Sequence, residues 1–502
     1  MFRYFIVRMS ALIIVLFGVV LARYAVYDSK NGKSFSFSLG GVPPRDFPEI
    51  KTRGKIVALT DNSSTSYFVY KGEPMGFEYE LLHAFASAEN LDLVITVAKD
   101  MNRVFEQLNR GEADIIAANL TVTKERKEKV SFTSPLLVTR QVLIQRKPAG
   151  WEKMPYESVE KKLIRNPVDL AGKNVCVRRE SSFYTRLKSL SEEIGGRINI
   201  VEVPGKYETE ELISMVADGK IDYTVADENV ALINQTYYPG IDIKTAISLP
   251  QQIAWAARKD APALMKKINA WIKDSRNKPL FAAIYSKYFR SPQEAAARRE
   301  SGFFSPAGGK ISVYDDLIRM YSAKIGWDWR LLASLIYQES HFCHDTRSWT
   351  GAYGLMQIIP ATSARLGIDS LCATPLESIR AGTVYLACID AYWKSYIPDS
   401  SERIKFTLAS YNVGTGHIID ARNLALKYGR NSGVWDGNVA YFILQKSKPE
   451  FYNDPVVRFG YCRGSEPFNY VKEILLRFEH YKNATEMKQI SSEKVQYIKS
   501  CI

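Results

Sequence analysis

Near residue 289 the chain changes from alternating strand-like and helix-like segments to helical periodicity alone. Upstream, from about residue 54, short β-rich runs alternate with amphipathic helical patterns, as at 55–60, 76–89, 93–97, 104–111 and 113–118. Such alternation predicts an α/β sheet built from βαβ units. Over 313–480 the apolar spacing is helical with no convincing strand, which predicts an all-α domain. Because 502 residues are too many for one ordinary core, we expect a multidomain protein.

The α/β region contains two similar lobes, because a second block of the same style begins near Asp169. Its expected strands and helices lie at 173–178, 182–190, 198–203, 210–218 and 222–227. We predict an α/β domain at 51–290, with lobe 1 at 51–142 and 241–290 and lobe 2 at 143–240. The remaining predicted parts are a loosely ordered linker at 291–311, an all-α domain at 312–482 and a polar tail at 483–502.

The N-terminus has the pattern of an export signal. Arg3 and Arg8 precede an apolar run at 9–22, which is too short to span a bilayer comfortably. We therefore expect residues 1–22 to be a signal peptide or a short N-terminal anchor.

Composition excludes some partners. The net charge is +13, but no block of Lys and Arg typical of a nucleic-acid arm is present, so we expect no nucleic-acid binding. His341 and His344 lack a second pair of ligands at useful spacing, so we expect neither a metal nor another cofactor.

Two motifs in the α/β region, GEPMGFEYELLHAFA (72–86) and GEADIIAANLTVTKERKEKVSFTSPLL (111–137), resemble the bacterial extracellular solute-binding proteins of the amino-acid-binding type. The resemblance implies a periplasmic-binding-protein-like fold whose two lobes close on a small ligand. It implies that Arg126 binds a ligand carboxylate and that Asp227 binds its amino group. The alternatives are a solvated Arg126 and a helix-capping Asp227. Tyr67 and Phe68 are candidates for an aromatic wall or for core packing.

The helical region carries one carboxylate in an unusual position. Leu332, Leu335, Ile336 and Glu339 fall at i, i+3, i+4 and i+7, which is one face of a helix. A carboxyl group that is poorly hydrated stays protonated near neutral pH, as a general acid must. The alternative is an exposed carboxylate at a helix end.

The segments QESHFCHDTRSWTGAYGLMQIIPATSARLGI (338–368), LASYNVGTGHI (408–418) and EPFNYVKEIL (466–475) resemble the soluble-lytic-transglycosylase-like domain, an all-α lysozyme-like fold. With the α/β region in front, the chain resembles membrane-bound lytic murein transglycosylases. The resemblance implies that Glu339 is the catalytic acid and base. It also implies substrate-binding roles for Ser348, Gln357, Tyr411, Asn412 and Tyr470. The imperfect third motif and Thr346, where the family usually has Ala, are departures from the pattern.

The implied reaction cleaves the β-1,4 bond between N-acetylmuramic acid and N-acetylglucosamine in peptidoglycan and leaves 1,6-anhydro ends. A ligand between the lobes, an amino acid or a muropeptide, would regulate it, and the protein would be exported to the periplasm, peripheral to the outer membrane. Two alternatives remain. One is a lysozyme-type hydrolase, which needs a second carboxylate such as Asp345. The other is a non-catalytic receptor that binds the wall or senses amino acids.

Overall fold

The computed structural model describes residues 46–276, 279–366 and 374–498. The predicted signal or anchor at 1–22 lies outside the described residues. Among the helices that are described, none combines the length and the apolar character needed to cross a bilayer.

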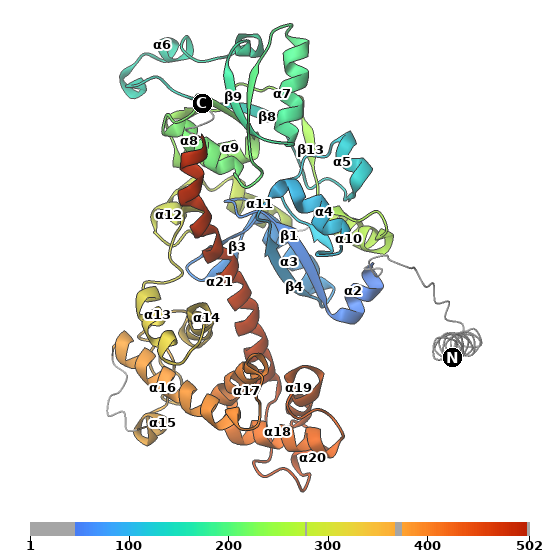
Figure 1. The fold of residues 1–502 in the computed structure, drawn as a ribbon, viewed down its shortest axis with the longest axis vertical. Helices are drawn as coiled ribbons and strands as arrows, with labels where there is room; N and C mark the ends of the chain where they lie inside the picture. The colour runs from blue at the N-terminus through green and yellow to red at the C-terminus, as the bar shows by residue number, and fades with distance from the viewer. Residues whose placement is uncertain (1–45, 277–278, 367–373, 499–502) are drawn as a thin grey trace, which may run out of the picture. The chain divides into compact units, whose positions relative to one another are not determined.

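Lobe 1 is built on a five-stranded sheet with the order β4-β1-β5-β14-β6 (Figure 1). Strand β1 pairs in parallel with β4 and β5, from Lys55 opposite Asp92 to Thr60 opposite Val97 in the first pair. Both faces of the sheet are covered, and helix α3 (Phe77–Ala88) buries Leu81, Leu82 and Phe85 against it. The strands are β1 (Lys55–Thr60), β4 (Asp92–Val97), β5 (Ile115–Ile116), β6 (Ser131–Phe132) and β14 (Ala256–Ala257).

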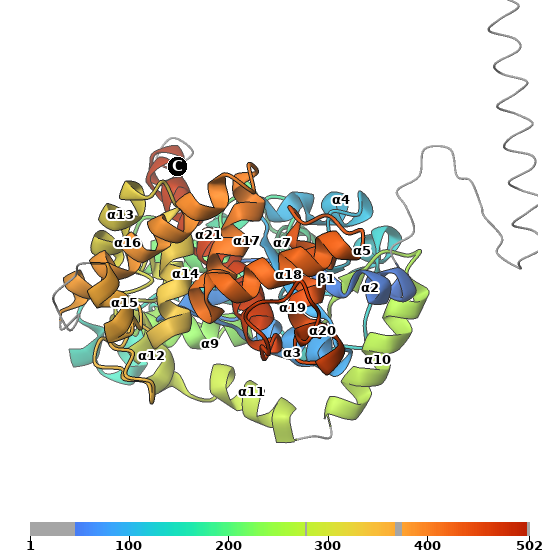
Figure 2. The same ribbon diagram turned by 90° about the horizontal axis from the view of Figure 1, so that it is seen from below.

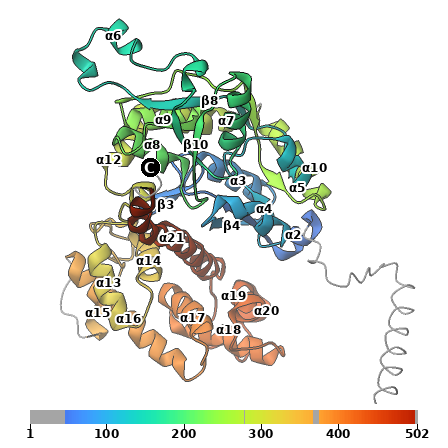
Figure 3. The same cartoon turned by 45° about the horizontal axis from the view of Figure 1, so that its top comes forward.

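Lobe 2 has a second five-stranded sheet with the order β10-β9-β11-β8-β12, which Figure 3 shows with α7, α8 and α9 beside it. Separate apolar clusters, around Val142 and Ile213 and around Leu143 and Leu187, form its core. Its elements are β8 (Gln141–Arg146), β9 (Asn174–Arg178), α7 (Ser182–Glu193), β10 (Asn199–Val203), α8 (Thr209–Ala217), β11 (Tyr223–Asp227), α9 (Glu228–Tyr237) and β12 (Ile241–Asp242).

The connection after lobe 1 is more ordered than the sequence predicted. Helix α12 (Pro292–Glu300) packs on α9, and the short helix η4 (Ser305–Ala307) follows it. Ser305 Oγ accepts a hydrogen bond from Val69 N at 2.9 Å. The prediction of a loosely ordered linker was therefore wrong, because α12 contacts lobe 2 and Ser305 contacts lobe 1.

The all-α prediction for the second domain is confirmed, since its described residues contain helices and isolated β-bridges but no strand (Figure 2). Helices α14 and α17 pack on α21, and α16 packs on α13 and α17. The helices are α13 (Asp315–Lys324), α14 (Trp329–Ser340), α15 (Pro360–Arg365), α16 (Pro375–Lys394), α17 (Ser400–Val413), α18 (Thr415–Lys427), α19 (Ala440–Gln445), α20 (Pro449–Tyr452) and α21 (Ser465–Ile498).

Helix α21 differs from the prediction at its C-terminal end. The sequence predicted a polar tail from residue 483, but the helix continues to Ile498. Asn483 Nδ2 donates to the Ile95 carbonyl of β4 at 2.9 Å, and Tyr481 OH donates to the Gly72 carbonyl at 3.0 Å. This helix therefore belongs to the all-α domain and also contacts lobe 1.

Candidate active site and ligand cleft

Glu339 lies in the last turn of α14, as the apolar spacing predicted. Leu332, Leu335 and Ile336 are fully buried on the same side of the helix. Asp328 begins the helix by accepting a hydrogen bond from Arg330 N, and His341 ends it in the left-handed conformation with φ 52°. The buried apolar face of α14 therefore ends in the carboxyl group of Glu339.

The carboxyl group of Glu339 is enclosed rather than solvated. Tyr470 OH, on α21, donates a hydrogen bond to Glu339 Oε1, and Tyr470 itself is 6% exposed. Burial raises the pKa of Glu339 to about 7, although the hydrogen bond from Tyr470 partly lowers it. A carboxyl group with this pKa can both donate and accept a proton near neutral pH.

The segment after α14 is held in unusual backbone conformations. Phe342 and Gln357 have φ of 61° and 47°, and Gly351 and Gly354 have φ of 81° and 80°. Positive φ is unstrained for glycine and costly for Gln357. Both glycines therefore allow the backbone to turn tightly beside the end of α14.

Ser348 and Gln357 brace this segment from within. Gln357 Nε2 donates to the carbonyls of Thr346 and Gly354 at 2.9 and 2.8 Å, and Ser348 Oγ accepts from Ala352 N at 3.0 Å. These contacts position the segment beside Ser340, whose Oγ donates to the Leu355 carbonyl. Direct contact of Ser348 or Gln357 with substrate stays a prediction.

Two further predicted residues lie at the end of α17. Tyr411 OH donates to the Met356 carbonyl at 2.6 Å, which joins α17 to the same segment. Asn412 is exposed. Trp349, at the turn before Gly351, is 98% exposed, and an exposed indole ring is a candidate for stacking on a sugar face.

The candidate second acid does not share the enclosed environment of Glu339. The Asp345 side chain is 72% exposed and pairs with His344 Nε2 at 3.1 Å. Among the described residues, no group of three His, Cys, Asp or Glu side chains is placed to hold a metal ion.

The interlobe cleft brings Arg126 and Asp227 together in a void of about 50 Å³. Arg126, on α5 (Lys124–Lys129), donates to the Thr121 carbonyl at 2.9 Å, and burial lowers its pKa to about 10. Asp227 precedes α9 but makes no capping hydrogen bond with its side chain. Instead its Oδ2 accepts from Asn119 Nδ2 at 2.7 Å across the lobes, and burial raises its pKa to about 7.

The sequence reasoning missed other residues of the cleft. Arg178, Asn119 and Glu210 also line it. Arg178 ends β9 and was visible only as the last residue of the strand expected at 173–178, and Glu210 was assigned simply to a helix. Tyr67 and Phe68 lie in the core instead, where Tyr67 is 1% and Phe68 0% exposed, so the interpretation as an aromatic wall was wrong.

Comparison with known families supports both domains. The model described as bacterial extracellular solute-binding proteins, family 3, matches residues 55–291. The model described as Transglycosylase SLT domain matches residues 316–432. Among solved structures, an ancestral arginine-binding protein bound to arginine aligns at 24% identity with a TM-score of 0.40, over 47% of this chain and 99% of that chain.

Relatives align with nearly the whole chain. The membrane-bound lytic murein transglycosylase F of Desulfosudis oleivorans is 35% identical over 434 residues, which cover 86% of this chain and 91% of the relative. The protein of the same name from Stutzerimonas stutzeri is 30% identical over 467 residues, covering 91% and 90%. The protein of the same name from Aeromonas hydrophila is 31% identical over 441 residues, covering 86% and 83%.

A solute-binding α/β domain followed by a helical SLT domain with an enclosed glutamate defines a lytic transglycosylase of peptidoglycan. Within that class, the chain belongs to the membrane-bound lytic murein transglycosylase F family.

Proposed function

We propose that the chain cleaves the β-1,4 bond between N-acetylmuramic acid and N-acetylglucosamine during cell wall turnover, with Glu339 as the only catalytic carboxylate. Glu339 protonates the leaving oxygen and then accepts the proton of the sugar's own C6 hydroxyl. That hydroxyl attacks C1, so the product ends in a 1,6-anhydro ring and water is not consumed. The supporting observation is the enclosed Glu339 carboxyl, with a pKa of about 7.

A lysozyme-type hydrolase is the competing function, and it needs a second carboxylate to activate water. The exposure of Asp345 favours the lyase. The test is digestion of purified peptidoglycan by the full chain and its Glu339→Gln variant, with products identified by mass spectrometry. We expect anhydro ends from the parent and a loss of at least about 100-fold in rate from the variant.

Asp345→Asn is the matched control, because it removes a neighbouring carboxylate of the same charge. It is expected to retain activity. Reducing ends from the parent chain, or digestion that persists in Glu339→Gln, would refute the mechanism.

We also propose that the α/β domain binds a small ligand, an amino acid or a muropeptide, which regulates the enzyme. Arg126 offers a bidentate cation to a carboxylate, and one oxygen of Asp227 is buried without a hydrogen-bond partner in the described structure. A ligand at 100 times its Kd would add about 2.7 kcal/mol to the free energy of unfolding. A thermal-shift screen of amino acids and wall peptides, with Asp227→Asn as control, measures this. No stabilisation by any of them would contradict the proposal.

The same proposal extends to location. The relatives are named membrane-bound, and the basic apolar N-terminus has the pattern of an export signal. We infer that the protein is periplasmic and peripheral to the outer membrane. Fractionation of cells, with release from membranes by high salt, tests this inference.

A further inference from the structure

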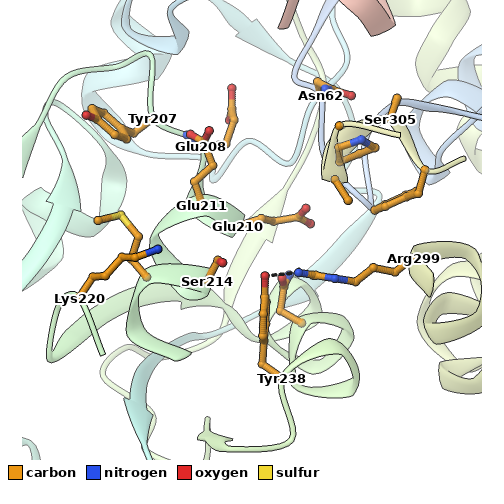
Figure 4. A pocket seen from close by; sticks show the side chains of 16 residues that line it. Asn62, Tyr207, Glu208, Glu210, Glu211, Ser214, Lys220, Tyr238, Arg299 and Ser305 are labelled. Atoms are coloured by element: carbon orange, nitrogen blue, oxygen red, sulfur yellow. Dashed lines mark hydrogen bonds between the residues drawn. The ribbon is translucent and has the colours of Figure 1, made fainter. Parts of the chain in front are cut away.

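The pocket of about 400 Å³ beside α8 offers no bare positive charge to an anion (Figure 4). Lys220 Nζ in its wall lies 2.7 Å from Asp218 Oδ2. Arg299 donates a hydrogen bond to Tyr238 OH, and its guanidinium lies 4.2 Å from the centre of that ring. Both cations are therefore engaged within the protein. A surface of a different kind lies on the all-α domain, where one short loop exposes two aromatic rings.

That loop, residues 453–464, connects α20 to α21 and is fixed from inside the domain. Asp420, on α18, accepts two hydrogen bonds from its backbone. Asp420 Oδ1 accepts from Arg458 N at 2.8 Å, and Asp420 Oδ2 accepts from Phe459 N at 2.9 Å. Asp420 is 0% exposed, so water does not compete for these bonds. The backbone is therefore held at the position of the first aromatic ring.

The carboxylate that anchors the loop is paired in turn with a buried cation. Lys446, which follows α19, is also 0% exposed, and its Nζ lies 2.7 Å from Asp420 Oδ2. The Lys446 carbonyl accepts a hydrogen bond from Cys462 N at 3.2 Å, so the loop is fixed at a second point. A buried ion pair is a weak source of stability compared with apolar packing. Its clearest consequence here is a loop held in one conformation.

The fixed loop turns aromatic side chains outward. Phe459 is 54% and Tyr461 58% exposed, whereas Cys462 beside them is 3% exposed. The Phe459 ring packs on the backbone of Gly416 in the first turn of α18, where an added Cβ would lie 2.5 to 2.7 Å from three ring carbons. Tyr461 contacts the ring of Tyr452, with centroids 5.8 Å apart at an angle of 80°. Each ring is thus supported by the protein and still open to solvent, as a stacking surface for a ligand must be.

This surface continues to the candidate active site along the chain between α17 and α18. Gly416 lies five residues after Tyr411, so their Cα atoms are at most about 18 Å apart. Every residue from Tyr411 to Gly416 is at least partly exposed. Burial, and then nearby Glu339 and Tyr411, raise the pKa of Tyr470, so the two tyrosines lie close together. Because Tyr470 donates to Glu339, a polymer bound at that carboxyl group can extend over the ring of Phe459.

We propose that Phe459 and Tyr461 form a platform that binds the glycan strand away from the bond that is cleaved. A pyranose ring presents a face of C–H groups, which can cover an aromatic ring while the sugar hydroxyls stay in water. The occupant is therefore the substrate itself, continued beyond the site of chemistry. The inference rests on the lytic transglycosylase activity, but not on which carboxyl group transfers the proton. Its consequence is a preference for long strands over short ones.

The test measures kcat and KM of the full chain on long glycan strands and on a tetrasaccharide of the same repeat. In Phe459→Ala we expect the ratio of kcat/KM on long strands to kcat/KM on the tetrasaccharide to fall about fivefold or more. Most of the change should appear in KM, because stacking binds substrate and transition state alike. Phe459→Trp keeps an aromatic face and should restore the ratio. Tyr461→Ala gives a second reading if Phe459→Ala folds poorly.

Tyr156→Ala is the matched control, because Tyr156 is 65% exposed on α6 (Tyr156–Glu160) of lobe 2, and it should keep the parent ratio. An unchanged ratio in both alanine variants of the loop, or an equal fall on both substrates, would overturn the proposal.

Binding without cleavage separates the platform from the chemistry. Titration calorimetry of long strands with Glu339→Gln, alone and combined with Phe459→Ala, should give an affinity about fivefold weaker for the combined variant. A parent chain that leaves peptidoglycan uncut would contradict the proposed function. Equal affinity of the single and combined variants would instead refute the platform.

Discussion

The hydrogen bond from Tyr470 to Glu339 sets the proton balance of the candidate active site. Burial raises the pKa of Glu339 to about 7, and the Tyr470 hydroxyl opposes this by favouring the carboxylate. The general acid must be protonated, so activity is expected to fall as pH rises through about 7. Tyr470→Phe removes the opposing hydrogen bond, which moves this fall to higher pH by about one unit.

The measurement is the pH profile of kcat/KM on peptidoglycan fragments. Tyr441→Phe is the matched control, since Tyr441 is exposed on α19 and contacts Arg430 rather than Glu339. Its profile should coincide with that of the parent. A fall that stays in place, or moves to lower pH, in Tyr470→Phe would contradict the assigned role of the tyrosine.

At this scale the sequence predicted positions better than contacts. Glu339 was predictable because its place depends on helical spacing, and that spacing is local. The hydrogen bonds of Gln357 to Thr346 and Gly354 form in a segment with positive φ at several positions, Gln357 among them, which no spacing reveals. For the same reason Asp227 was ambiguous: only the structure turns its side chain to Asn119 and away from the helix end.

Helix α21 joins the candidate active site to lobe 1 through a buried histidine. His480 Nδ1 lies 2.8 Å from Tyr67 OH, and burial, with nearby Arg477 and His83, lowers the pKa of His480 to about 3. The folded pKa is below the unfolded value of 6.5, so the folded state binds fewer protons. The stability that His480 contributes is therefore complete above pH 6.5 and is lost as pH falls toward 3.

His480→Asn removes this titration while keeping a neutral polar side chain. We compare the slope of the free energy of unfolding against pH between pH 6 and pH 4. We expect this slope to be smaller in the variant than in the parent by about 1.4 kcal/mol per pH unit. Urea unfolding at several pH values measures the slope. His344→Asn is the matched control, because it makes the same substitution at an exposed position. An unchanged slope in His480→Asn would show that this histidine is not held neutral.

The elements of the α/β region were largely predictable, and those outside regular domains were not. The strand expected at 55–60 is β1, with the same ends, because its apolar residues are buried on both faces of the sheet. Helix α12 was missed because PQEAAARRE has only alanines as an apolar stripe. The end of α21 was missed because a polar sequence gives no periodic signal, although the Asn483 side-chain amide donates a hydrogen bond to the Ile95 carbonyl of β4.

At the scale of the molecule, lobe 1 and the all-α domain share buried surface. One apolar cluster contains Phe68 of lobe 1 together with Leu335 and Ile474 of the helical domain. Polar contacts cross the same boundary, since Tyr337 OH donates to Glu73 Oε1 at 2.5 Å. The sequence predicted two separate domains joined by a linker, because contacts between distant segments leave no mark on local periodicity.

This shared surface predicts that the two regions unfold together. Calorimetry of the full chain should give one transition for lobe 1 and the all-α domain, because neither keeps its core when the other unfolds.

Gly72→Ala tests the boundary directly. Gly72 has φ 85°, and a Cβ there would lie 2.7 Å from Tyr481 Oη and 2.8 Å from a Tyr337 ring carbon, so the two surfaces must move apart. The variant should still unfold in one transition, but at a clearly lower Tm than the parent, because both regions lose part of their shared core. Gly429→Ala is the matched control, since Gly429 has φ 70° but open space around it, and it should lower a single Tm slightly through backbone strain alone. Two transitions in the parent chain would show that the regions unfold independently. Equal Tm values for Gly72→Ala and Gly429→Ala would show that the boundary contributes little to stability.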